Sequence, residues 1–398
     1  MTDWRSLAPA ERIVLDCIFW SAGLSRHELA TKVGFSKSRT NAATGALIDR
    51  GLIEEAGPGC STGGRRPETL SLSRQIGIFA AIDLGATSLD VALLAPDMSI
   101  LAHHAEPADV RSGPGVIVSR IRALLRELIK KCRVNGRDIA AIGMGVPGPV
   151  DFADGLLVAP PLMPGWEGLS IAEYLHEDYA APVFIDNDVN LLAMGELWRV
   201  HRQIRDFLVI KVGTGIGCGI VCRGEIYRGA DGSAGDVGHI CVDYNGPRCH
   251  CGNDGCVEAM AAAPALSRLA VEAARGGRSI LLAEWLETRG TLVPEDVSQA
   301  SRSGDVAANA IIQLTGELLG RMLASLVNFY NPSHVFIGGG VSQIGPLYLA
   351  SIRQSVYRRS LPLSTRHIHI EFAKLNELGG IIGAGALAFQ ECLKRAPA

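Results

Sequence analysis

Two segments of the chain share one pattern, an apolar strand that runs directly into a glycine turn. Phe79–Thr87 and Phe207–Gly215 both show it. Each is followed by a second apolar run, which predicts a β-hairpin entered from a buried strand. Because the pattern occurs twice, we predict two related halves.

Long amphipathic segments separate the predicted strands. Residues 115–132 form one predicted helix and precede a strand at 139–146. Residues 306–329 form another, which ends before Pro332 and is followed by a strand at 334–337. Strands that alternate with helices are typical of an α/β fold.

Composition excludes several classes of protein. Of 398 residues, 47% are hydrophobic, which is enough for a substantial core, and the 46 glycines follow no collagen repeat. We expect no membrane segment, because no apolar run reaches about 20 residues. We also expect no secretion signal, and therefore a cytoplasmic protein with mostly reduced cysteines. The net charge of -3 argues against a chain built wholly around nucleic acid.

Residues 1–75 differ from the rest of the chain, and their pattern predicts short helices. Ser25 followed by Glu28 is a capping box, Gly34 ends the helix that it starts, and Ser36 can cap the next helix. Two short helices joined through a glycine turn predict a helix-turn-helix unit.

The segments after this unit predict a wing. Residues 51–55 and 69–72 are its expected strands, and residues 63–67 form its tip. The start of a second helix usually contacts base edges, and arginines at a wing tip can reach phosphate or the minor groove. The candidate DNA-binding residues are Ser36, Lys37, Ser38, Arg39, Thr40, Arg65 and Arg66. The alternative is a small interaction domain whose charges are merely solvated.

A cluster of cysteines gives the strongest local signal. His239 is followed by Cys249, Cys251 and Cys256 within a glycine-rich turn. Three thiolates and one imidazole suit a closed tetrahedral Zn²⁺ site. Spacing alone leaves His250 open as the imidazole ligand.

The glycine turns are candidates for binding nucleotide phosphates through backbone N–H groups, with Asp83 available to a Mg²⁺-bound water. Each turn alone is more often an ordinary hairpin, but their repetition favours a nucleotide cleft. The residues concerned are Asp83, Gly85, Thr87, Gly213, Thr214, Gly215, Gly217, Gly338 and Gly339.

Asn187 and Asp188 follow the apolar strand 183–185. A carboxylate there can accept a proton from a substrate hydroxyl that attacks phosphate, and the asparagine can hydrogen-bond a neighbouring hydroxyl. Equally, both residues can simply cap the helix that follows.

Taken together, these motifs resemble the ROK family (repressor, open reading frame, kinase) over essentially the whole chain. The motifs occur in family order, and they are Asp83–Thr87, Gly143–Asp151, Asn187-Asp188, Gly213–His239 and the cysteine cluster. The resemblance implies an α/β, actin-like two-lobed sugar kinase (ribonuclease H-like) fold preceded by an α+β winged helix-turn-helix domain. The implied domains are residues 1–75, a first lobe at 76–190 and a second lobe with the zinc loop at 191–398.

The resemblance also implies roles for individual residues. By this resemblance, Asp188 occupies the position of the kinase general base. The implied zinc ligands are His239, Cys249, Cys251 and Cys256. The implied sugar contacts are Asn187, Asp188, Asp236, His239 and Glu258. Two positions depart from the family pattern, because Asp236 stands where Glu is usual and Leu162 where a sugar-contacting Asn is common.

The 75-residue head resembles that of the repressor branch. This branch implies a sugar-responsive regulator that binds operator DNA as a homo-oligomer, dimer or tetramer, with a monosaccharide or amino-sugar effector in the cleft between the lobes. The alternative is a hexose or amino-sugar kinase, dependent on ATP and Mg²⁺, that retains a DNA-binding head. A third interpretation is a sugar-binding scaffold without DNA contact.

Overall fold

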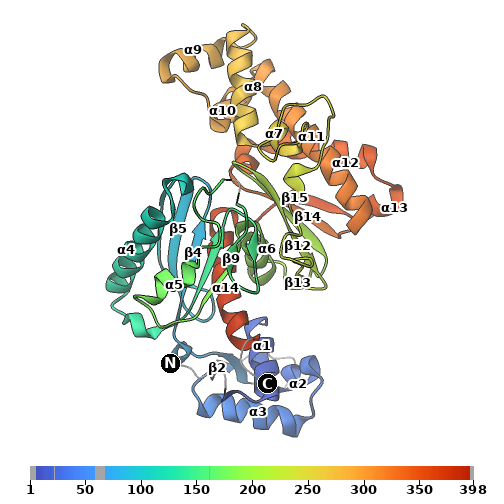
Figure 1. Ribbon diagram of the computed structural model, residues 1–398. Coiled ribbons are helices and arrows are strands. Elements are labelled where there is room, and N and C mark those ends of the chain that lie inside the picture. The colour runs from blue at the N-terminus through green and yellow to red at the C-terminus, as the bar shows by residue number, and fades with distance from the viewer. Residues whose placement is uncertain (1–5, 22, 59–67, 161, 395–398) are drawn as a thin grey trace. The chain divides into compact units, whose positions relative to one another are not determined.

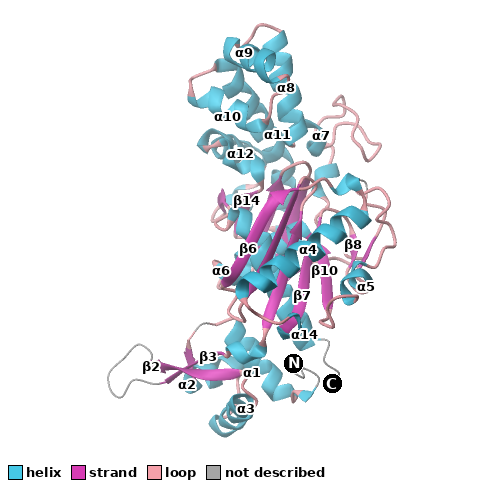
Figure 2. Cartoon of the chain, turned by 90° about the vertical axis from the view of Figure 1, so that its left-hand side faces the viewer, coloured by secondary structure: helices cyan, strands magenta, loops and turns pink. Residues whose placement is uncertain are grey.

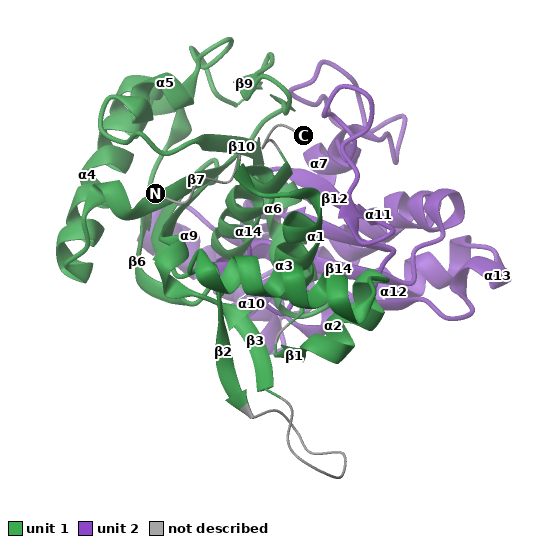
Figure 3. Cartoon of the chain, turned by 90° about the horizontal axis from the view of Figure 1, so that it is seen from below, with its two compact units in different colours: residues 1–202, 380–398 green, residues 203–379 purple. Residues whose placement is uncertain are grey.

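The computed structural model describes residues 6–21, 23–58, 68–160 and 162–394, and the chain forms two compact units (Figure 3). Unit 1 comprises residues 1–202 and 380–398, and unit 2 comprises residues 203–379. The sequence predicted a boundary at residue 190 and a second lobe that ran to the end of the chain. Instead the chain leaves unit 1 after Arg202 and returns at Gly380, because its last helix packs into the sheet of unit 1.

The head of unit 1 has the predicted helix-turn-helix and wing (Figure 2). Its elements are α1 (Pro9–Phe19), α2 (Arg26–Val33), α3 (Lys37–Asp49), β1 (Leu24–Ser25), β2 (Ile53–Pro58) and β3 (Glu68–Leu72). The capping box is confirmed, since Glu28 N donates to Ser25 Oγ at 3.3 Å and Ser25 N donates to Glu28 Oε2 at 2.8 Å. Gly34 ends α2 with a φ of 69°, which favours glycine, and Ser36 caps α3. The wing tip at 63–67, with Arg65 and Arg66, lies outside the described residues.

The rest of unit 1 is built on a five-stranded sheet of order β10-β7-β4-β5-β6. Its strands are β4 (Ile78–Leu84), β5 (Ser88–Leu94), β6 (Ile100–Pro107), β7 (Ile139–Val146) and β10 (Val183–Asn187), with β8 (Val150–Asp151) and β9 (Leu156–Leu157) as a separate pair. Its helices are α4 (Pro114–Cys132), α5 (Ile171–His176), α6 (Asp188–Arg199) and α14 (Gly379–Lys394). Strands β4, β7 and β10 run parallel, so their carboxyl ends meet at one edge of the sheet.

Unit 2 is built on a second five-stranded sheet, of order β13-β12-β11-β14-β15. Its strands are β11 (Phe207–Val212), β12 (Ile216–Cys222), β13 (Glu225–Ile226), β14 (His334–Gly338) and β15 (His369–Phe372). Its helices are α7 (Val257–Ala261), α8 (Ala263–Arg275), α9 (Ile280–Arg289), α10 (Pro294–Arg302), α11 (Val306–Tyr330), α12 (Pro346–Arg359) and α13 (Pro362–Thr365). Helix α11 is apolar and long enough to span a membrane, but 61% of its most apolar window is buried inside the structure, so it is a core helix.

The two sheets have the same topology. In unit 1, β4, β5 and β6 form an antiparallel meander, and β7 and β10 extend it as parallel strands on the other side of β4. In unit 2, β11, β12 and β13 form the meander, and β14 and β15 are the parallel strands. The predicted relationship between the two halves is therefore confirmed, and with it the predicted α/β class.

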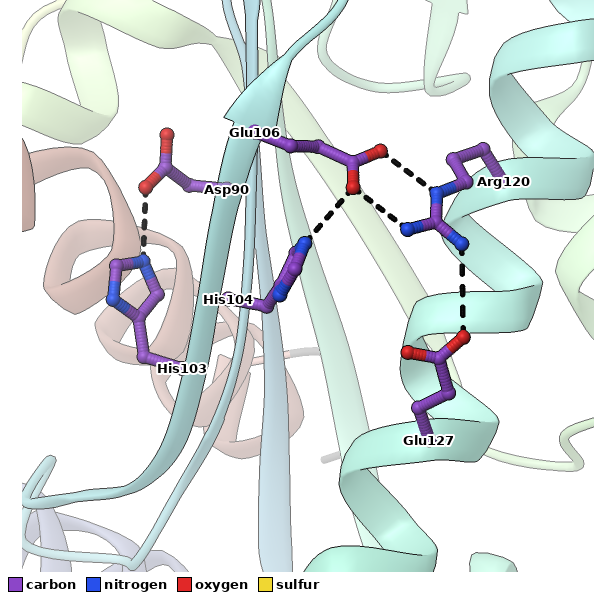
Figure 4. Close-up of polar contacts among 6 residues, drawn as sticks. All are labelled: Asp90, His103, His104, Glu106, Arg120 and Glu127. Carbon is purple, nitrogen blue, oxygen red and sulfur yellow. Dashed lines mark hydrogen bonds and ion pairs between the residues drawn. The ribbon is translucent and has the colours of Figure 1, made fainter.

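A polar cluster connects β6 to α4 in unit 1 (Figure 4). Arg120 donates two hydrogen bonds to Glu106, each 2.7 Å long, and His104 Nε2 lies 2.8 Å from Glu106 Oε2. The guanidinium of Arg120 is the main reason why the pKa of Glu106 falls from its ordinary value of 4.5 to about 2. Glu106 therefore stabilises the fold while it is ionised.

The sign of this effect predicts how stability depends on pH. Because the pKa of Glu106 is lowered on folding, its contribution is complete above about pH 4.5 and is lost as the pH falls towards 2. We expect Arg120→Ala to unfold at a lower urea concentration than the wild type at pH 7, with a difference that narrows between pH 4.5 and 2. Arg120→Lys, which keeps the charge but not the paired donors, should be intermediate. If the difference in urea midpoint between the wild type and Arg120→Ala stays constant between pH 4.5 and 2, the stabilising role assigned to ionised Glu106 is wrong.

Candidate functional site

The carboxyl ends of β4, β7 and β10 bring Asp83 and Asp188 to opposite sides of Gly145. A Cβ placed on Gly145 would lie 3.2 Å from Asp83 Oδ1 and 3.3 Å from the Cα of Asp188. Gly85 and Thr87 occupy the turn between β4 and β5, where Gly85 N donates to the carbonyl of Ser88 at 2.9 Å. We refer to this edge, defined by Asp83, Gly145, Asn187 and Asp188, as the ligand edge of unit 1.

Asn187 caps α6, as one of the two sequence interpretations predicted. Its Oδ1 accepts a hydrogen bond from Val189 N at 2.9 Å, and its Nδ2 donates to the carbonyl of Gly148 at 3.1 Å. Asp188 is the first residue of α6, and its exposed fraction is 7%. The cap does not exclude ligand binding, because it fixes Asn187 and Asp188 at a sheet edge where open α/β folds bind ligands.

Asp186 organises this turn and was missed at the sequence level. It is only 2% exposed, and its Oδ1 accepts hydrogen bonds from Asn187 N at 2.8 Å and Asn190 Nδ2 at 2.9 Å. The signal was available, because an aspartate one residue before a helix-capping Asn can accept hydrogen bonds from the first turn.

Helix α14 packs against the ligand edge through its glycines (Figure 1). A Cβ on Gly380 would overlap Asp83 Oδ2, and a Cβ on Gly383 would overlap the backbone carbonyl of Leu191 in α6. The start of α14 therefore lies against Asp83, and its next turn lies against the helix that begins at Asp188.

The other ends of α6 and α14 meet the head in a cluster of buried aromatic rings. Phe389 of α14 stacks on Phe19 of α1, with ring centroids 4.0 Å apart, and Trp198 of α6 lies 5.3 Å from Phe19. Phe389 also contacts Phe79, at the start of β4, with centroids 5.7 Å apart. We call Phe19, Phe79, Trp198 and Phe389 the aromatic junction, and it was not predicted from the sequence.

The remaining predicted phosphate turns lie together in unit 2. Gly213, Thr214 and Gly215 connect β11 to β12, and Gly213 N donates to the carbonyl of Gly215 at 2.9 Å. Gly217 lies within β12, where it pairs with Lys211 of β11. Gly338 ends β14 beside Lys211, and Gly339 follows with a φ of 83°, so close to Val212 that a Cβ would overlap its carbonyl. The two turns are thus neighbours at the carboxyl ends of parallel strands.

Glu258 on α7 holds the first of these turns. Its Oε2 accepts a hydrogen bond from Ile216 N at 2.9 Å. A Cβ on Gly215 would lie 2.7 Å from the same oxygen, so the absence of a side chain there lets the carboxylate approach the turn. One oxygen of Glu258 therefore has a structural role.

The predicted cysteine and histidine residues form a compact cluster. The ligand atoms of His239, Cys249, Cys251 and Cys256 all lie within 4.8 Å of one another. Cys249 Sγ lies 3.5 Å from His239 Nδ1, and Cys251 Sγ lies 3.6 Å from Cys256 Sγ. His250 is exposed and is not part of this cluster, so of the two histidines that the spacing left open, His239 is the one that lies with the three cysteines. The group is a possible metal site.

His239 presents its two ring nitrogens to different partners. Nδ1 is the atom near Cys249, and Nε2 lies 3.7 Å from Asp236 Oδ1. A ligand-holding imidazole commonly has its second nitrogen oriented by a carboxylate. Asp236 occupies that position here.

The surface of the head confirms part of the predicted DNA-binding set as accessible. Ser36, Lys37, Ser38 and Arg39 are exposed at the start of α3, and the Arg39 guanidinium lies 3.9 Å above the ring of Phe35. Thr40 is a correction to this set, because it is 1% exposed and its hydroxyl donates to the carbonyl of Ser36 at 3.1 Å. Its side chain packs inside the head.

Two family models match the chain. The model of the ROK family matches residues 79–391, and a model of the winged helix-turn-helix DNA-binding type matches residues 9–54. The chain belongs to the ROK family. The ROK match begins just after the head and ends within α14, so it includes both sheets and the helix that returns to unit 1.

Individual ROK proteins match either nearly the whole chain, as two regulators do, or about four fifths of it, as a kinase does. The xylose repressor of Caldicellulosiruptor bescii is 29% identical over 383 residues, which are 96% of this chain and 95% of that protein. The crystal structure of a ROK family transcriptional regulator, a homologue of the E. coli MLC protein, has a TM-score of 0.82 and 25% identity, covering 99% of this chain and 98% of that one. A ROK family glucokinase from Streptomyces griseus, in complex with glucose and AMPPNP, has a TM-score of 0.69 and 28% identity, covering 79% of this chain and 100% of that one.

Proposed function

We propose that this chain is a sugar-responsive transcriptional repressor, which binds operator DNA through its head and a monosaccharide or amino-sugar effector through its ROK domain. The proposal is supported by the positions of helices α6 and α14. Both begin at the ligand edge, at Asp188 and beside Asp83, and both contact Phe19 of the head near their other ends.

The geometry of the two helices makes them suitable for transmitting a displacement. From Gly380 to Phe389, α14 rises about 13 Å, which is the length of β4 from Asp83 to Phe79. The helix therefore spans the sheet from the ligand edge to the aromatic junction. Because packed interiors are dense and compress little, a shift at one end moves the other end instead of being absorbed.

The head has the features that major-groove recognition needs. The start of α3 presents Lys37 and Arg39 with two serines, and the Phe35 ring limits the freedom of the Arg39 guanidinium. The salt bridge of 2.8 Å between Arg26 of α2 and Glu55 of β2 fixes the wing to the helices. We infer that α3 is the recognition helix and that two copies of the chain read a palindromic site.

The effector contacts that we propose are polar groups with fixed orientations. In unit 1 they are Asn187 and Asp188, and in unit 2 they are Asp236, His239 and Glu258. Capping of α6 supports the first pair, and the hydrogen bond from Ile216 N positions Glu258 while its other oxygen is available to a sugar hydroxyl. An effector acts on DNA affinity only if it binds one head arrangement better than another.

We further propose that His239, Cys249, Cys251 and Cys256 hold a structural Zn²⁺. In a tetrahedral site with Zn–S bonds of about 2.3 Å, neighbouring sulfurs are about 3.8 Å apart. The observed separation of 3.6 Å between Cys251 Sγ and Cys256 Sγ is close to this value, and the donor set of three sulfurs and one nitrogen suits zinc. Bound zinc would orient the imidazole of His239 next to the proposed sugar contacts.

DNA binding by the start of α3 is the first test. A duplex selected from a random pool by the full-length protein provides the ligand, and fluorescence anisotropy measures affinity. We expect Arg39→Ala to weaken binding at least about fivefold, since a base-contacting arginine contributes about 1–3 kcal/mol. Arg275→Ala, an exposed arginine on α8 of unit 2, is the control and should leave the affinity unchanged. Equal affinities for wild type and Arg39→Ala would contradict the proposal.

Coupling through the aromatic junction is tested with a conservative variant. The effector is first identified as the monosaccharide that raises the melting midpoint of the wild type. We then expect Phe389→Leu to bind DNA as the wild type does, but to lose most of the change in DNA affinity that the effector causes. The substitution keeps an apolar side chain but removes volume and the ring stacking, so it should cost about 1–3 kcal/mol of stability.

The matched control for this variant is Phe336→Leu. Phe336 is equally buried, in an aromatic pair with Phe207 in unit 2, and its ring centroid is 5.3 Å from that of Phe207. It should lose comparable stability and keep the full effector response. If both variants keep the response, the aromatic junction does not transmit it.

Zinc content tests the metal proposal. We expect about one zinc per wild-type chain by elemental analysis, most of it lost in Cys251→Ser, because three ligands hold zinc far less tightly than four. Cys241→Ser is the control, since Cys241 is an exposed cysteine of the same loop outside the cluster. Removal of zinc by a chelator should abolish the effector-induced rise in melting midpoint while DNA binding remains. Equal zinc content in the two variants would exclude the assigned ligand set.

A further inference from the structure

Unit 2 contains a cavity of about 360 Å³ that the sequence did not predict. One wall is the segment Ile240–Val242, which follows His239, and another is the face of α11 that carries Arg321, Ser325 and Asn328. Arg359, at the end of α12, completes the lining. A cavity of this size falls within the range of small-molecule sites, about 300–1,000 Å³.

The cavity lies in an excess of positive charge. Arg321, Arg358 and Arg359 all contact the same oxygen, Oε1 of Glu317, at 3.1, 3.2 and 3.4 Å. One carboxylate therefore balances three guanidinium groups, two of which line the cavity. Among the described lining residues, none is an aspartate or a glutamate. An anion placed there would compensate the two remaining charges.

The lining residues also supply hydrogen-bond donors. Arg321 Nε is buried and has no hydrogen-bond partner among the described residues. Asn328 Oδ1 accepts from Leu361 N at 3.0 Å, so the amide keeps its Nδ2 donors for another partner. The hydroxyl of Ser325 can add a further donor. A buried guanidinium N–H without an acceptor is costly, so this donor set suits a ligand that brings several oxygens.

We propose that this cavity binds a small phosphate monoester, with the phosphate at Arg321 and Arg359. A monoester carries close to two negative charges at neutral pH and three terminal acceptor oxygens. It therefore matches both the charge excess and the donors, whereas a neutral sugar offers acceptor oxygens but no charge to balance the guanidinium groups. Guanidinium groups bind phosphate through paired N–H donors, which favours arginine over lysine at these positions.

One wall of the cavity is hydrogen-bonded to the loop that carries the proposed zinc ligands. Val257 N donates to the carbonyl of Ile240 at 3.0 Å, and Val242 N donates to that of Gly255 at 2.9 Å. The cavity wall is thus hydrogen-bonded to the segment that carries Cys256. A bound phosphate monoester would restrain the loop that holds His239, and this consequence, unlike the site itself, rests on the proposed function.

Isothermal titration of the full-length protein tests the site directly. The probes are inorganic phosphate, glucose 6-phosphate, neutral glucose and succinate, at constant ionic strength. We expect glucose 6-phosphate to bind with a Kd below 1 mM, inorganic phosphate to bind more weakly, and succinate not to compete. Arg359→Gln and Arg321→Gln should each weaken glucose 6-phosphate binding at least tenfold.

Arg358→Gln is the matched control. Arg358 contacts the same Glu317 oxygen but does not line the cavity, so its loss should change the affinity less than twofold. No binding of either phosphate compound at 10 mM would overturn the proposal, as would equal losses in Arg358→Gln and Arg359→Gln. If Arg359→Gln instead alters the sedimentation coefficient and leaves phosphate binding intact, the cavity serves a contact between copies of the chain and the proposal is wrong. None of these outcomes depends on operator binding, which the Arg39→Ala measurement tests separately.

Discussion

The close approach of α14 to the ligand edge is the contact on which the organisation of unit 1 depends. It is possible only because Gly380 and Gly383 have no side chains, so that helix backbone lies directly against Asp83 and the carbonyl of Leu191. Gly383 contacts the backbone of Leu191 and Gly380 contacts the side chain of Asp83, so at these two positions no side chain of α14 separates the helix from its neighbours. The last helix of the chain is therefore packed directly on the strand end and helix that carry the candidate ligand residues, and its Phe389 is packed on the head.

Much of the fold was predictable because its signals are local. The capping box at Ser25 and Glu28, the glycine that ends α2, and the strand at 139–146 each depend on residues a few positions apart, and the structure reproduces them. The convergence of Cys249, Cys251 and Cys256 was predictable for the same reason, because the three cysteines are closely spaced, whereas spacing alone did not choose His239 over His250. Even the relationship between the halves is a local pattern that occurs twice.

The features that were not predicted depend on contacts across the chain. Phe389 and Phe19 lie at opposite ends of the sequence, and nothing near either residue indicates that their rings stack. The contact of Gly380 with Asp83 is equally distant in sequence, so the second lobe was expected to run to the last residue. The inward orientation of Thr40 is a different case. Thr40, Ala43, Thr44 and Leu47 are buried at the i, i+3, i+4 and i+7 positions of one helix face, and this periodicity was available in the sequence.

The two units organise their candidate ligand residues by different physical means. In unit 1, Asn187 and Asp188 are positioned by a buried sheet and a helix cap, so their geometry follows from the core. In unit 2, His239 lies at the start of a loop with little regular secondary structure, which is held by backbone hydrogen bonds, by packing of Ile240 and Val242 against the core, and by the cluster of His239, Cys249, Cys251 and Cys256. The zinc that we propose for this cluster would fix the orientation of the His239 imidazole. Loss of the proposed zinc should therefore disturb the proposed effector contacts of unit 2, while the packing between the ligand edge of unit 1 and the head stays intact.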